Sequence, residues 1–140
     1  MTDEKLFQQF CDCTLPAKEW THRGHVKVAY LHLCKYPFKE ALERLRERIQ
    51  KYNASRNVPE GPFEGYNETT THAFLHIMKA TMNAYAEVFP VTDADSFCDT
   101  HTHLLNKHLL RIFYSPQQRM SPDAKTLFVE PDLTPLPKIL

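Results

Sequence analysis

Two histidines near the start of an expected helix form the most suggestive chemical pattern in the sequence. His22 and His25 are three residues apart, so their side chains project from one face of a helix, one turn apart. This spacing lets two imidazoles reach one metal ion. Trp20, the only tryptophan, lies just before them and is a candidate for substrate contact. The same face continues into apolar positions. Packed structural imidazoles and metal-free acid–base or substrate contacts therefore stay open as alternatives.

A second polar cluster opens another expected helix and supplies a carboxylate. Glu68 follows Tyr66 and Asn67, and a carboxylate in the first turn suits the positive end of a helix. His22, His25 and Glu68 would together give two imidazoles and one carboxylate with open positions. That set suits zinc or non-haem iron. Tyr66 and Asn67 are candidates for substrate binding.

Two more histidines share one face of a helix expected over residues 93–114. His101 is the fourth candidate metal ligand, and His108, seven residues later, is a candidate for substrate contact. Histidines on a core-facing surface are also typical of structural packing. These two positions are therefore of lower rank than His22 and His25.

The residue types predict two kinds of chemistry for this site. With one divalent transition metal, iron or zinc, the ion would polarise a substrate or activate water or dioxygen. Without a metal, Glu68 and one of His22 and His25 would act as an acid–base pair. The first hypothesis is therefore a small helical protein with a buried His/Glu site that works as a metal-dependent enzyme of unknown substrate. The alternative is a non-catalytic interaction module, or one that binds a small-molecule ligand, with structural histidines.

Composition excludes several classes of function. Lys+Arg and Asp+Glu both number 17, so no net field attracts nucleic acid. The apolar runs end well before the roughly 20 residues of a membrane span. The four cysteines form no paired zinc motif, and no secretory segment precedes them, so we expect a cytoplasmic protein. Phosphate-binding loops and dinucleotide fingerprints do not occur. The sequence leaves the oligomeric state open.

Hydrophobic periodicity predicts an all-α protein with one helical-bundle domain over residues 1–140. Four long helices are expected over 17–36, 38–55, 66–89 and 93–114. Short helices are expected over 3–13 and from residue 121. The Pro-rich tail over 131–140 is expected to be extended and to pack on the bundle.

Three segments together give the chain a resemblance. They are Trp20-Thr21-His22-Arg23-Gly24-His25, Gly65-Tyr66-Asn67-Glu68-Thr69, and the run from Val129 to Pro137. The chain resembles a family of small, uncharacterised bacterial helical proteins with W-T-H-x-x-H, G-Y-H-E-T and P-D-L-x-P-L-P segments. The resemblance implies no activity, but it favours His22, His25, Tyr66 and Glu68 as site positions. The family has histidine at the position of Asn67; if that histidine is a ligand or a base, the site here is altered or weakened.

Overall fold

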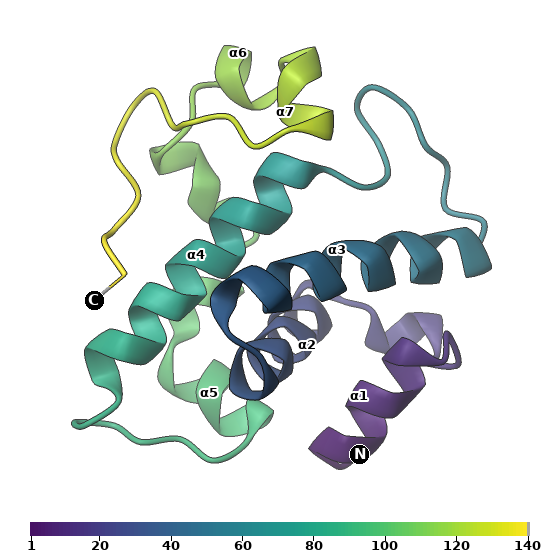
Figure 1. Ribbon diagram of the computed structural model, residues 1–140, viewed down its shortest axis with the longest axis vertical. Coiled ribbons are helices and arrows are strands. Elements are labelled where there is room, and N and C mark those ends of the chain that lie inside the picture. Colours follow the sequence, from purple (N-terminus) through teal and green to yellow (C-terminus); the bar gives the residue numbers. More distant parts are fainter. Residues whose placement is uncertain (140) are drawn as a thin grey trace.

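Three long helices cross near the middle of the protein. The computed structural model describes residues 1–139, and within them every regular element is a helix. The long helices are α2 (His22–Lys35), α3 (Phe38–Ser55) and α4 (Glu68–Tyr85). Figure 1 shows α3 and α4 crossing at a wide angle, with α2 behind them. The expected all-α class is confirmed.

Shorter helices surround this crossing. They are α1 (Asp3–Cys11), α5 (Ala94–Thr100), α6 (Pro116–Arg119) and α7 (Pro122–Thr126), with short 3₁₀ turns over Ala17–Glu19, Thr102–Leu105 and Leu109–Ile112. In Figure 1, α7 lies over the start of α4, whereas α1 lies at the opposite side of α3. Helix α2 is central because it packs against α1, α3, α4 and α5. No helix among residues 1–139 has both the length and the apolar character needed to cross a membrane.

The helices begin where the sequence supplies a cap. The Thr21 side chain accepts a hydrogen bond from the Gly24 amide at 3.1 Å, and Asn67 Oδ1 accepts one from the Thr70 amide at 2.8 Å. Gly24 is needed for close approach, because a Cβ there would collide with the carbonyl oxygen of Glu19. These contacts fix the first turns of α2 and α4, which carry the candidate site residues.

The prediction of one long helix over 93–114 is wrong. After α5 the backbone leaves the helical region at His101, with φ −113° and ψ 62°. The rest of the segment forms two short 3₁₀ turns, which bury Leu104 and Leu110. A continuous helix would also have turned Ile112 inward, but this side chain is 60% exposed. The tertiary contacts that bury these leucines therefore favour two short turns over one regular helix.

The C-terminal segment runs along the surface as an extended strap. Asp132 accepts hydrogen bonds from the Ser115 amide and hydroxyl at 2.8 and 2.6 Å. Further along, Nε2 of His76 on α4 donates to the Pro137 carbonyl at 2.6 Å. Figure 1 shows this segment in yellow passing beside α4. Residue 140 lies outside the described residues.

Candidate functional site

Glu68, the first residue of α4, is held by three hydrogen bonds. Arg46 on α3 donates from Nε and Nη2 to the two carboxylate oxygens, each at 2.7 Å. The Tyr66 hydroxyl donates to Oε1 at 2.8 Å. Glu68 is only 6% exposed. A two-point contact of this kind between a guanidinium and a carboxylate is both strong and directional.

These bonds decide the ionisation of the cluster. Burial raises the pKa of Glu68, but the hydrogen bonds from Arg46 and Tyr66 outweigh it and hold the pKa below its ordinary value. The carboxylate is therefore charged at neutral pH. Burial, together with the bond to Glu68, raises the pKa of the Tyr66 hydroxyl, which stays protonated as a donor.

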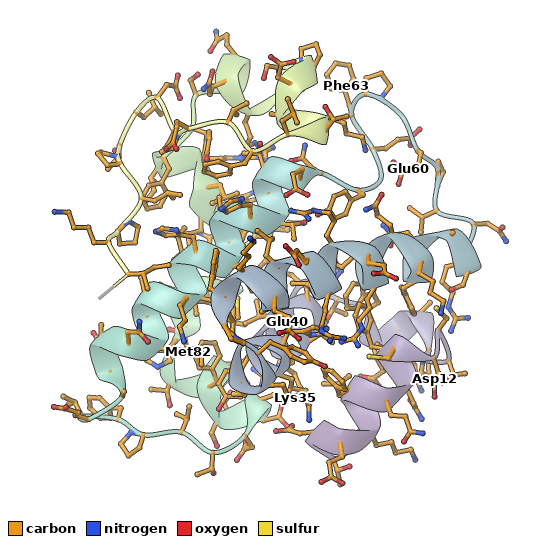
Figure 2. All side chains as sticks on the ribbon, viewed as in Figure 1. Asp12, Lys35, Glu40, Glu60, Phe63 and Met82 are labelled. Atoms are coloured by element: carbon orange, nitrogen blue, oxygen red, sulfur yellow. The ribbon has the colours of Figure 1, made fainter. Side chains whose placement is uncertain are left out.

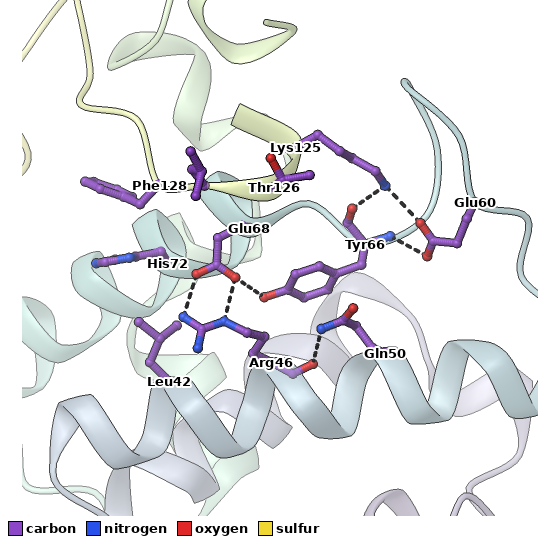
Figure 3. Close-up of a pocket in the computed structure, with 11 residues that line it drawn as sticks. Leu42, Arg46, Gln50, Glu60, Tyr66, Glu68, His72, Lys125, Thr126 and Phe128 are labelled. Carbon is purple, nitrogen blue, oxygen red and sulfur yellow. Dashed lines mark hydrogen bonds and ion pairs between the residues drawn. The ribbon is translucent and has the colours of Figure 1, made fainter. Parts of the chain in front are cut away.

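The cluster lines an open pocket of about 600 Å³, which we call the Glu68 pocket. Figure 3 shows the pocket between α3, the start of α4 and the segment at α7. Its polar lining includes Arg46, Gln50, Glu60, Glu68, His72 and Lys125. Leu42 and Phe128 supply apolar walls on opposite sides. A volume of several hundred Å³ with a few convergent polar groups is typical of a small-molecule site.

Lys125 on α7 holds the loop that connects α3 and α4 beside the pocket. Its ammonium donates to Glu60 Oε2 at 3.0 Å, to the Glu64 carbonyl at 2.7 Å and to the Tyr66 carbonyl. Glu60 in turn accepts from the Tyr66 amide at 3.0 Å. In Figure 2, Glu60 and Phe63 mark this connection at the edge of the molecule. The contacts therefore hold the long loop in place next to Glu68.

His72 lies one turn after Glu68 on α4 and lines the same pocket. Its ring stacks on Phe128, with centroids 3.9 Å apart. Burial lowers the pKa of His72, and the nearby charge of Glu68 only partly opposes this. The imidazole is therefore neutral at pH 7, beside a charged carboxylate.

His22 and His25 line a different and smaller recess, which we call the histidine cavity. Its volume is about 140 Å³, and none of its lining residues also lines the Glu68 pocket. Apolar side chains from α2, α3 and α4 dominate the lining, among them Ala29, Ile49 and Phe74. The two pockets therefore have separate linings, although both draw on α3 and α4.

Each histidine of the pair is fixed by a separate contact. His22 Nε2 donates to the carbonyl of Leu104 at 2.9 Å. The His25 ring packs against Trp20, with centroids 3.8 Å apart. The His25 side chain is exposed, but desolvation by the surrounding protein atoms and the neighbouring His22 lower its pKa to about 4. His25 therefore presents a neutral ring at physiological pH.

The structure does not assemble the predicted metal set. His22 and His25 lie together, but Glu68 lines the other pocket and is engaged by Arg46. His101 is buried elsewhere, with its ring centroid 5.0 Å from that of Phe97. Within residues 1–139 no three His, Cys, Asp or Glu side chains are grouped so that they could hold a metal ion.

The remaining predicted residues have varied surroundings. Tyr66 lines the Glu68 pocket, whereas Trp20 reaches the histidine cavity only through its contact with His25. Asn67 caps α4, which occupies its side-chain oxygen. His108 is exposed and lines neither pocket. The predicted site is thus divided between two places.

Sequence reasoning missed Arg46, Lys125 and Phe128. One signal for Arg46 is present, because it lies one helical turn after the buried Leu42 rather than on the exposed face of α3. No local signal marks Lys125, since its partners lie about 60 positions earlier. The role of Lys125 therefore follows from tertiary contacts alone.

Comparisons with known proteins add no identity. No protein family, no curated protein and no solved structure matches the chain. The resemblance stated from the three sequence segments therefore stays a prediction.

Proposed function

We propose that the protein binds a small polar molecule of no net charge in the Glu68 pocket. The observation that carries this proposal is a buried, charged carboxylate, held by Arg46 and Tyr66, in the wall of a pocket of about 600 Å³. A site whose polar groups are already fixed loses little freedom when a ligand binds.

The balance of charge favours a neutral or zwitterionic ligand. Two cations, Arg46 and Lys125, face two carboxylates, Glu68 and Glu60, and each cation is paired with one carboxylate. A ligand with a large net charge would find no compensating field here. A molecule with both donors and acceptors can interact with these groups, and Phe128 offers an aromatic surface for its apolar part.

A blocking substitution tests the proposal. The probes are the free amino acids, monosaccharides and polyols, screened by saturation-transfer NMR against the full chain. Gln50 is exposed and lines the pocket, so Gln50→Trp should fill it and weaken a bound probe at least about tenfold, or about 1.4 kcal/mol. The matched control is Gln8→Trp on α1, which is exposed and lines neither pocket. Equal binding by both variants, or no binding by the native chain, would contradict the proposal.

Acid–base catalysis in the same pocket is a second candidate. The supporting observation is the neutral imidazole of His72 one turn from the charged Glu68. A probe that binds should then also be converted by the native chain. His72→Gln should retain binding and lose turnover by about 100-fold or more. A probe that binds but is not converted would contradict catalysis and support the binding function only.

A further inference from the structure

The histidine cavity is a second recess, built very differently from the Glu68 pocket. Its walls come from the first turns of α2 and from the facing sides of α3 and α4. Leu45, Ile49, Phe74 and Met78 are among its apolar lining residues. Its polar lining residues are His22, His25, Thr70, Thr71 and the exposed Lys107. It is therefore a mainly apolar cavity with a few polar lining groups.

The size of the cavity limits the ligand. Engineered apolar cavities of about 150 Å³ accept a single benzene ring, and this cavity measures about 140 Å³. His25 and Lys107, which line the recess, are exposed, so substituents on a ligand can extend toward solvent. The volume of the recess is therefore sufficient for one small ring.

The two histidines of the cavity determine which substituent on that ring can form a hydrogen bond. His22 uses its Nε2 proton for the carbonyl of Leu104. The ring nitrogens of His25 have no hydrogen-bond partner anywhere in residues 1–139, and the side chain is accessible. A neutral imidazole has one lone pair that accepts a hydrogen bond. A ligand hydroxyl can donate to that nitrogen while the ring occupies the apolar part.

We propose that the histidine cavity binds a single aromatic ring that carries a hydroxyl group, with the hydroxyl donating to His25. The ligand class is a phenol. The ring packs among Phe74, Ile49 and Met78, and the contact of the His25 ring with Trp20 keeps the accepting imidazole in place. This site is independent of the Glu68 pocket, since the two share no lining residue.

The test is a titration of the full chain with phenol and with benzene, followed by ¹H–¹⁵N NMR. The native chain should bind phenol with a dissociation constant of about 1 mM, and the amide signals of the cavity residues should shift. His25→Phe keeps an aromatic ring against Trp20 but removes the acceptor. It should weaken phenol at least about tenfold and retain benzene. Phenol bound equally by the native chain and by His25→Phe would overturn the proposal, as would no phenol binding by the native chain.

A second pair of variants keeps the test independent of His25. Ala29 lines the cavity, so Ala29→Leu should fill it and remove the binding of both phenol and benzene. The matched control is Ala84→Leu, at an exposed position of α4 outside the cavity, which should change neither affinity. Persistence of phenol binding in Ala29→Leu would place the ligand elsewhere and refute the assignment.

Discussion

The two pockets of this protein differ in the charge of their titratable groups. In the Glu68 pocket the charges are kept, because Arg46 and Tyr66 donate three hydrogen bonds to one carboxylate. In the histidine cavity the charge is avoided, because desolvation by the surrounding protein and the neighbouring His22 lower the pKa of the exposed His25 to about 4. The first arrangement favours polar ligands that exchange hydrogen bonds. The second favours an apolar ring with one donor.

The difference also shows why sequence spacing alone misleads about metal sites. Two histidines and a glutamate on neighbouring helices have the composition of a ligand set. Here the glutamate faces Arg46 on α3, so its charge is already compensated. The histidines face apolar side chains of α3 and α4. What decides the chemistry is which helix faces meet.

Removing the carboxylate should have the largest effect on stability. Glu68→Ala leaves Arg46 and the Tyr66 hydroxyl without their acceptor, which should reduce the free energy of unfolding by about 2–3 kcal/mol. Arg46 is partly exposed, so water compensates some of the loss. Urea denaturation would measure the change. The control is Glu43→Ala on the exposed face of α3, which should change stability by less than about 0.5 kcal/mol.

The pH dependence of this loss gives a second readout. The pKa of Glu68 is lower in the folded protein than its ordinary value of 4.5, so the folded state binds this proton less readily than the unfolded state. The stabilisation by the charged form is therefore fully present above pH 4.5 and disappears as the pH falls through the folded pKa. The stability difference between the native chain and Glu68→Ala should shrink below pH 4.5. A difference that grows there would contradict the assignment.

A smaller effect should separate capping from ligand contact at Asn67. Asn67→Ala removes the oxygen that accepts from the Thr70 amide and should cost about 1 kcal/mol of stability. Asn67→Asp preserves an acceptor and should remain close to the native value. Because Asn67 does not line the Glu68 pocket, neither variant should change the affinity for a probe bound there. A large loss of affinity with unchanged stability would restore Asn67 as a binding residue.

The helices were predictable where local signals agree. Helix α3 was expected over 38–55 and begins and ends at those residues, because Pro37 fixes its start and an apolar stripe including Leu42 and Leu45 marks one face. The region after α5 was not predictable. Its apolar residues suit a helix, but tertiary burial of Leu104 and Leu110 favours separate short turns.

The candidate site was predictable in its residues but not in its grouping. His22 and His25 do share one cavity, as their spacing on α2 indicates. Tyr66 and Glu68 also lie in one pocket. The contact of Glu68 with Arg46, 22 residues earlier, depends on how α3 crosses α4. No periodicity in either helix specifies that crossing.

The most direct test of two separate sites is an NMR titration of the histidines in the native chain and in Glu68→Gln. The charge of Glu68 raises the pKa of His72. The pKa of His25 is instead set by desolvation and by the neighbouring His22. Loss of that charge should therefore lower the pKa of His72 further and leave the pKa of His25 at about 4. A His25 pKa that changes in Glu68→Gln, with that of His72 unaffected, would mean that Glu68 and the histidine pair form one site and would contradict this account.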